Sequence, residues 1–124
     1  MDSMQIKDSF VNFKATPKEI KSLGKACANL AKSNLGVAQK ESVDIAEIGN
    51  KAYISSVQKD GKTLVKVELK NDQGANAYTL IKTGSAEDTK KFLNMPKSVN
   101  KLADIIDSLK ESVKRATERE SYTD

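Results

Sequence analysis

Very few side chains in this sequence could act as catalytic groups or metal ligands. Its 124 residues include no histidine and only one cysteine, Cys27. Without histidine there is no Ser-His-Asp or Cys-His catalytic set, no histidine general base, and few ways to build a zinc site. A single cysteine cannot form a thiolate metal cage or a CxxC redox pair. The sequence therefore predicts a protein that is not an enzyme and that needs no metal or other cofactor.

The remaining candidates for chemistry have ordinary structural explanations. Cys27 falls on an apolar helical stripe, where a free cysteine is typically a buried packing residue. Asp104 and Asp107 are three residues apart on a predicted helix. Such a pair could serve acid–base chemistry or bind Mg²⁺, but paired carboxylates on a solvated helix are usually only solvated. No glycine-rich stretch leads into Lys-Ser or Lys-Thr, so a nucleotide-binding P-loop is absent.

Lysines and tyrosines in the middle of the sequence could serve binding. Lys66 is predicted to share a sheet face with Tyr53, Glu68 and, in one of two registers, Tyr78. A sheet that presents aromatic rings and cations can stack nucleic-acid bases. Against this, Glu68 lies opposite Tyr53, and only two of the 21 basic residues are arginine, whose guanidinium fork is favoured for phosphate and base recognition. A solvated sheet face is the preferred interpretation.

Two further features favour binding to a protein partner. The apolar stripe of the last predicted helix is broad, and Leu109 and Val113 on it could pair with a second copy or with a partner helix. The alternative is that this stripe only completes the core. The segment 75–79 contains no proline, and the first charge of its predicted strand is Lys82, so the edge of that strand could accept an added strand.

The first element that would position these residues is a helix predicted over 17–33. Thr16-Pro17-Lys18-Glu19 combines a capping box with proline at the first helical position. Apolar residues then recur every three or four positions as far as Leu30. Gly24 weakens the helix by about 1 kcal/mol, and it could also allow another backbone to approach closely. Residues 1–15 show no clear period and form a segment of uncertain order.

A change of period in the middle of the chain predicts a four-stranded antiparallel meander. Asp-Gly and Gly-Asn pairs are signals for two-residue hairpin turns, because such turns need positive φ. The predicted strands are 43–48, 51–59, 62–70 and 75–83, joined at Gly49-Asn50, Asp60-Gly61 and Asn71–Gly74. A short helical turn beginning at Ser42 competes with the first of these strands.

The turns also predict the register of the sheet. With Asp60-Gly61 as a turn, Ile54 lies opposite Val67; with Gly49-Asn50 as a turn, Ile45 lies opposite Ile54. Both pairings place the apolar residues on one face, as a period of two requires. The fourth strand has two registers: a four-residue loop turns Tyr78 inward, and a three-residue loop turns Thr79 inward.

Two helices are predicted to close the chain. A short helix begins after Ser85 and ends before Pro96, and a longer one over 98–116 carries an apolar stripe of about four turns. Residues 117–124 lose the stripe and are predicted to fray. Because the apolar face of the sheet must be covered, we expect a single α+β domain over 1–124, in the order αββββαα, with its helices packed on one sheet face.

Composition and charge limit the functional classes to which the protein can belong. Hydrophobic residues make up 38% of the sequence and charged residues 31%, which is typical of a globular protein. The net charge of +4 would help binding to nucleic acid or an acidic partner without requiring either. No apolar run is long enough to span a bilayer. The single cysteine and the polar opening residues lead us to expect a cytoplasmic protein, with non-classical export left open.

The sequence supports two functional hypotheses. The preferred one is a small noncatalytic protein-interaction module, such as an adaptor, a chaperone-like protein or an inhibitor, because catalytic sets are missing and a helical stripe and a strand edge are available. The alternative is a nucleic-acid-binding domain that uses the lysine-rich sheet face or the basic end of the last helix.

Overall fold

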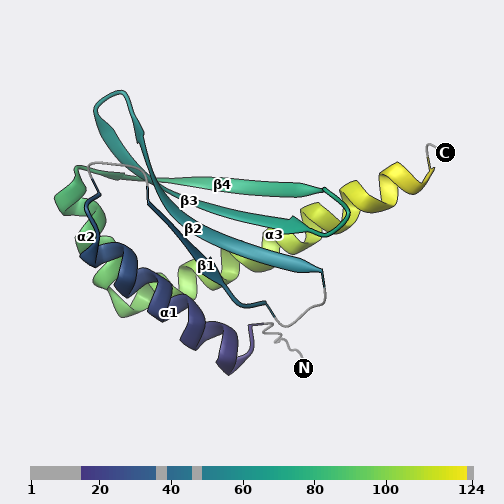
Figure 1. The fold of residues 1–124 in the computed structure, drawn as a ribbon, viewed down its shortest axis with the longest axis horizontal. Coiled ribbons are helices and arrows are strands. Elements are labelled where there is room, and N and C mark those ends of the chain that lie inside the picture. The colour runs from purple at the N-terminus through teal and green to yellow at the C-terminus, as the bar shows by residue number, and fades with distance from the viewer. Residues whose placement is uncertain (1–14, 36–38, 46–48, 123–124) are drawn as a thin grey trace, which may run out of the picture.

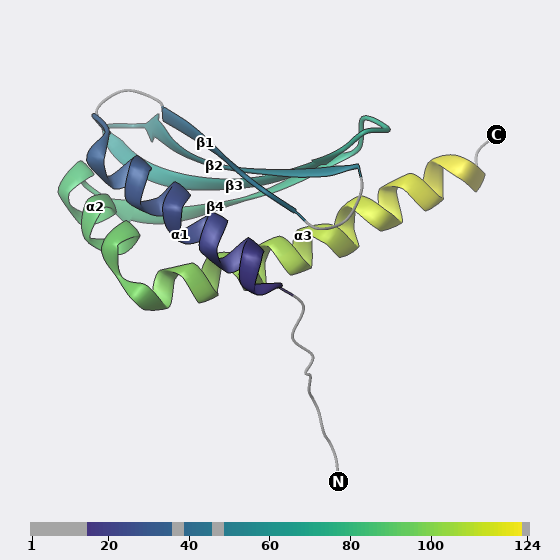
Figure 2. The ribbon, with the colours of Figure 1, turned by 60° about the horizontal axis from the view of Figure 1, so that its bottom comes forward.

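The computed structural model describes residues 15–35, 39–45 and 49–122, with side chains as far as residue 118, and shows one antiparallel sheet with three helices on one side of it (Figures 1 and 2). The strands follow one another across the sheet in the order β1-β2-β3-β4. The predicted α+β class and the order αββββαα are confirmed. The elements are α1 Pro17–Lys32, β1 Gln39–Val43, β2 Asn50–Lys59, β3 Lys62–Asn71, β4 Asn76–Gly84, α2 Ala86–Asn94 and α3 Pro96–Tyr122.

Helix α1 begins as its capping box predicts. The Glu19 N–H donates to Thr16 Oγ1 at 3.1 Å, and the Thr16 N–H donates to Glu19 Oε1 at 3.0 Å. Its stripe buries Cys27 and Leu30 in the core. A Cβ added at Gly24 would meet no atom within 4 Å, so the idea that this glycine admits another backbone is wrong. Gly24 is only a weak point in the helix.

The central hairpin has the predicted register. Ile54 pairs with Val67, and the turn residues Asp60 and Gly61 have φ of 52° and 75°. Two consecutive residues with positive φ are the signature of the tight turn that Asp-Gly favours. Ile54 and Val67 are both buried, so this hairpin supplies the centre of the apolar sheet face.

The predicted position of the first strand was wrong. Strand β1 ends at Val43, which pairs with Ala52, and Ile54 lies opposite Glu41 instead of Ile45. The physical reason is that Asn50 is already the first residue of β2, so Gly49-Asn50 is not a two-residue turn. Gly49 has φ of 86°, and a Cβ there would also lie 3.0 Å from the Asp72 carboxylate. The register is displaced by an even number of residues, and Val43 therefore still faces the core.

The segment after β1 bears on the competing helical interpretation. Ser42, where a helical turn would begin, lies in the strand, and Ile45 follows the strand as a half-buried residue packed against the core. The prediction of a helical turn is therefore wrong for residues 42 and 43. Residues 46–48 lie outside the described part of the chain.

Strand β4 follows the register of a three-residue loop. The Asn71 N–H donates to the Ala75 carbonyl at 3.0 Å, and Gly74 takes φ of 90°. Thr79 consequently faces the helices, whereas Tyr78 and Leu80 face away from them and are 57% and 42% exposed. A bulge interrupts the pairing near the end of the strand, where Thr63 pairs with Gly84 and Leu64 with Lys82.

Helix α2 is capped as predicted, and α3 is longer than the predicted range 98–116. The Asp88 N–H donates to Ser85 Oγ, and the Ser85 N–H donates to the Asp88 carboxylate. These hydrogen bonds from Ser85 lower the pKa of Asp88. Helix α3 continues to Tyr122, and Thr117 Oγ1 accepts a hydrogen bond from Asn71 Nδ2 at 2.9 Å. That residues 117–124 fray in solution stays a prediction.

The core lies between the sheet and the helices. Its members come from one face of the sheet and from the stripes of the three helices, so the opposite face of the sheet is covered by none of the described helices (Figure 2). We call that uncovered side the outer face. Within residues 15–35, 39–45 and 49–122, no helix combines the length and the apolar character that crossing a membrane would require.

Candidate functional site

The outer face gathers the positive charge of the sheet. Because side chains alternate between faces along a strand, the observed register places all seven strand lysines on this face. They are Lys40, Lys51, Lys59, Lys62, Lys66, Lys70 and Lys82. The one acidic strand residue beside them is Glu68, since Glu41 faces the helices. Seven lysines less one glutamate give this face a formal charge of +6; the whole chain carries +4, which leaves −2 elsewhere.

A row of three side chains crosses the middle of the outer face. Tyr53 on β2 pairs with Glu68 on β3, which pairs in turn with Tyr78 on β4. The two tyrosines lie two strand spacings apart, about 10 Å. Each ring has a lysine over it: Lys40 Nζ is 4.3 Å from the centroid of Tyr53, and Lys66 Nζ is 4.9 Å from that of Tyr78. These cation–π contacts hold ammonium groups next to the half-buried ring of Tyr53 and the exposed ring of Tyr78.

Glu68 fixes the side chains around this row. Its Oε1 lies 3.9 Å from Lys66 Nζ, and its Oε2 accepts a hydrogen bond from Asn76 Nδ2 at 3.0 Å. The pair between Glu68 and Lys66 is partly exposed and contributes at most about 1 kcal/mol to stability. Its effect is geometric, because it orients Lys66 and Asn76 on either side of the acid.

The structure brings four of the six residues predicted for partner binding together and separates the other two. Tyr53, Lys66, Glu68 and Tyr78 occupy two adjacent rows of the outer face. The other two, on α3, are only 5% and 3% exposed and pack in the core on the opposite side of the sheet; they are Leu109 and Val113. The described part of the α3 stripe is thus used inside the domain.

A hollow of about 560 Å³ opens where the outer face reaches the β2–β3 turn. Leu64 and Leu80 give it apolar surface, and Leu64 is only 7% exposed although it belongs to the outer face. Three lysines and one aspartate are among the residues that line it. The lining residues are Lys59, Asp60, Lys62, Thr63, Leu64, Leu80, Lys82, Thr83 and Gly84.

Sequence reasoning named a lysine-rich sheet face, but it did not place all the strand lysines on that face and it missed the hollow. Lys62, Lys66 and Lys70 are separated by even numbers of residues, so they must share a face of any regular strand. Counting the lysines of each predicted strand by face would have revealed the basic surface. The hollow had no such signal, because it depends on the bulge that brings Lys82 opposite Leu64.

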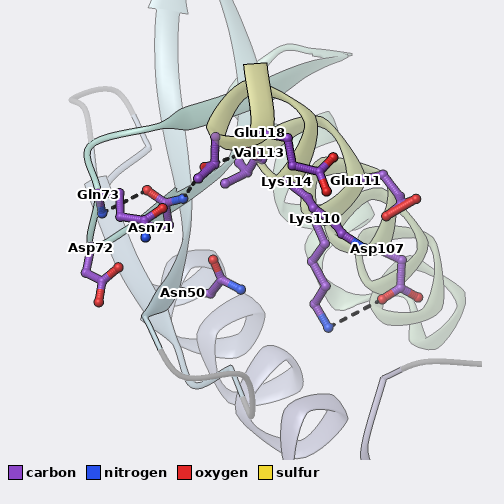
Figure 3. A pocket seen from close by; sticks show the side chains of 11 residues that line it. Asn50, Asn71, Asp72, Gln73, Asp107, Lys110, Glu111, Val113, Lys114 and Glu118 are labelled. Carbon is purple, nitrogen blue, oxygen red and sulfur yellow. Dashed lines mark hydrogen bonds and ion pairs between the residues drawn. The ribbon is translucent and has the colours of Figure 1, made fainter. Parts of the chain in front are cut away.

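A second open groove, of about 530 Å³, lies between the β3–β4 turn and the later part of α3 (Figure 3). Its walls carry both signs of charge: Lys110 Nζ lies 3.7 Å from Asp107 Oδ1, and Lys114 stands near Glu118. Asn71 closes one side by its hydrogen bond to Thr117. Among the residues that the structure describes, no three or more Cys, Asp or Glu side chains gather in a way that could hold a metal ion.

Cys27 has the properties of a packing residue. It is buried in the core, and desolvation by burial raises the pKa of its thiol from 9.0 to about 11. Because the thiolate is the reactive form of cysteine, this side chain stays protonated and unreactive at neutral pH.

Comparison of the chain with protein-family models, with curated proteins and with solved structures finds no match. Functional inference therefore starts from the geometry of the outer face.

Proposed function

We propose that this protein is a noncatalytic binding module whose outer face binds single-stranded nucleic acid. The observation that supports the proposal is the segregation of charge: every lysine of the strands lies on the face that the described helices leave uncovered, with two tyrosines among them. This changes the balance between the two sequence hypotheses. A net charge of +4 is modest for the chain, whereas +6 on one sheet face is a concentrated field for a polyanion.

The geometry suits a single strand better than a duplex. Unpaired bases can stack on exposed aromatic rings, and each stacked base contributes about 1 to 3 kcal/mol by alanine substitution. Tyr78, which is 57% exposed, and the half-buried Tyr53 supply two rings in one row. The neighbouring rows hold Lys40 and Lys66 on one side and Lys70 on the other. Bound bases would take the ring faces, and phosphates would draw the ammonium groups away from the rings.

The decisive experiment measures binding of a labelled single-stranded oligonucleotide by fluorescence anisotropy across a salt series. Phosphate contacts release counterions, so the logarithm of the association constant should fall linearly with the logarithm of salt concentration, by about 0.7 for each phosphate neutralised. We expect Lys66→Gln and Lys70→Gln each to weaken binding and to reduce that slope. Lys21→Gln and Lys97→Gln, at exposed positions on α1 and α3, are the matched controls.

Two results would contradict the proposal. One is an affinity that does not change with salt. The other is an equal loss of affinity in the sheet variants and in the helix controls. Thermal melts of all four variants verify that each protein is folded. The three exposed substitutions should change stability by less than about 0.5 kcal/mol, and Lys66→Gln, at a half-buried position paired with Glu68, by at most about 1 kcal/mol.

A second candidate function, binding of a protein through the edge of β4, is favoured by one observation. Strand β4 pairs with β3 alone in the described sheet, and its outward side chains Tyr78 and Leu80 are among the most exposed large apolar residues. An edge of this kind can accept an added strand. Capture of a protein that survives high salt and nuclease treatment, and that is lost in Leu80→Asp, would support this function over the first.

A further inference from the structure

We infer that the hollow beside the β2–β3 turn is a subsite for the phosphorylated end of a nucleic-acid strand, meaning a terminal nucleotide that carries a phosphomonoester. The inference rests on the proposed function and deepens it. It assigns a role to the part of the outer face that is concave, whereas the tyrosine row stands on the regular part of the sheet. The observations concern the position of the hollow, the rigidity of its wall and its charge.

The hollow lies at one end of the path that the outer face offers. Tyr78, Leu80 and Lys82 are successive outward residues of β4, and the distance from the first to the last along the strand is about 13 Å. The β2–β3 turn forms one end of the sheet, and the C-terminal end of α3 projects beyond the other (Figure 1). A strand lying on the tyrosine row and running along β4 therefore reaches the hollow where the sheet ends.

The wall of the hollow is held by hydrogen bonds at the bulge. Thr83 is the extra residue, since Thr63 pairs with Gly84 and Leu64 with Lys82. The Thr83 hydroxyl donates to the Thr63 carbonyl at 2.9 Å and also lies 2.6 Å from the hydroxyl of Thr89 on α2. The bulge thus ties the end of the sheet to a helix on its other face, and a bulge of this kind re-aims neighbouring side chains.

The charges around the hollow favour a group with more than one negative charge. Lys59, Lys62 and Lys82 contribute three ammonium groups and Asp60 one carboxylate, a formal total of +2. A phosphomonoester carries about −1.5 to −2 at pH 7, whereas each phosphodiester within a strand carries −1. The lysines therefore distinguish a terminal phosphate from an internal one. Leu64 and Leu80 provide apolar surface for the attached nucleoside.

The test compares oligonucleotides of one sequence that end in a 5′-phosphate, a 3′-phosphate or only hydroxyl groups, with the dye on the opposite end. We expect one phosphorylated form to bind about five- to tenfold tighter than the hydroxyl form, as one added charge beside three partly exposed ammonium groups allows. The preference should disappear in the double variant Lys59→Gln/Lys82→Gln. It should persist in Lys51→Gln/Lys70→Gln, which removes the same charge from the other end of the outer face.

A pH series gives a second readout. The phosphate loses its second charge as the pH falls through its second pKa of about 6, so the preference should shrink between pH 7.5 and pH 5.5. Equal binding of all three oligonucleotides overturns the inference and leaves the proposed function standing. A preference that persists in Lys59→Gln/Lys82→Gln also overturns it. If no oligonucleotide binds, both the proposed function and this inference are overturned.

Discussion

At the scale of single residues, the side of the sheet decides what a leucine does. Leu69 on β3 and Leu80 on β4 have the same side chain and lie on adjacent strands, yet Leu69 is completely buried beneath the helices and Leu80 lies on the outer face. Burial of a whole leucine side chain contributes about 1.5 to 3 kcal/mol, so only the first of the two contributes fully to the stability of the fold.

We therefore expect Leu69→Ala to lower the free energy of unfolding by about 2 to 5 kcal/mol, because it removes apolar contacts and leaves a cavity. The matched change Leu80→Ala should lower it by only about 1 kcal/mol, because Leu80 is 42% exposed. Urea denaturation followed by circular dichroism measures both. Similar losses for the two variants would show that the outer face is covered in solution.

The burial of the Cys27 thiol leads us to predict how stability changes at high pH. Its pKa is raised to about 11 by burial, against 9.0 ordinarily. A raised folded-state pKa contributes stability that is complete below pH 9 and is lost as the pH rises through 11, since the unfolded chain ionises first. Relative to Cys27→Ala, the parent protein should lose up to about 3 kcal/mol more over that window. Parallel stability curves for the two proteins, from urea denaturation at each pH, would contradict this.

At the scale of elements, the junctions between secondary structures depend on backbone conformation. Gly84 ends β4 with φ of 113°, and a Cβ there would lie 2.7 Å from Asp88 Oδ2. That carboxylate caps α2 through the Ser85 N–H. Gly24, within α1, has neither constraint. Replacement of Gly84 and replacement of Gly24 should therefore change stability in opposite directions.

We expect Gly84→Ala to destabilise the protein by about 1 to 3 kcal/mol, through backbone strain and displacement of the capping carboxylate. Gly24→Ala should stabilise it by about 0.5 to 1 kcal/mol, since alanine favours the helix and restricts the unfolded chain. Thermal melts show directly which variant is less stable than the parent protein and which is more stable. A stabilising Gly84→Ala would mean that the β4–α2 junction has been described wrongly.

The contact between Asn71 and Thr117 gives a further prediction for α3. Asn71 Nδ2 donates to Thr117 Oγ1, and the same Asn71 accepts through Oδ1 from the N–H groups of Gln73 and Ala75 in the β3–β4 turn. Thr117→Val keeps the shape and removes the acceptor, so it should reduce stability by about 1 kcal/mol. Glu118→Gln, on the same turn of the helix, should have no measurable effect in the same denaturation assay.

Local chemistry explains which elements could be predicted from the sequence. The Thr16 and Ser85 caps and the Asp60-Gly61 turn are short-range signals, and the elements that they predict are present. The position of β1 was predicted wrongly because its inward residues Gln39 and Glu41 are polar and show no apolar period. The Gln39 N–H donates to Ser56 Oγ, and Glu41 Oε1 accepts a hydrogen bond from Asn29 Nδ2. Long-range hydrogen bonds of this kind leave no pattern in the local sequence.

The candidate site likewise contains features that the sequence could predict and features that it could not. The common face of Tyr53, Lys66 and Glu68 follows from strand alternation and could be predicted. The orientation of Tyr78 needed the loop length, and the hollow needed the bulge at Thr83, which is fixed by bonds to Thr63 and to Thr89 on another element. Tertiary hydrogen bonds therefore mark the limit of what the sequence could specify.

At the scale of the whole molecule, the two layers have different roles. The helices and the inner sheet face hold the core, and the outer face carries charge and aromatic surface without contributing much to it. Substitutions on the outer face should therefore alter binding and leave folding unchanged. This separation makes the proposed function open to a clean test, because the variants expected to lose binding are also expected to remain folded.

The lysines of the outer face are not the only surplus of positive charge, because α1, α2 and α3 on the other side of the sheet carry +3, 0 and +1, a further +4. At physiological salt the field of a charged face extends about 8 Å, so in the last nanometre of an encounter a polyanion is attracted to either layer of the molecule. Only the outer face then offers it aromatic rings, and the association rate should fall more steeply with salt than diffusion alone allows.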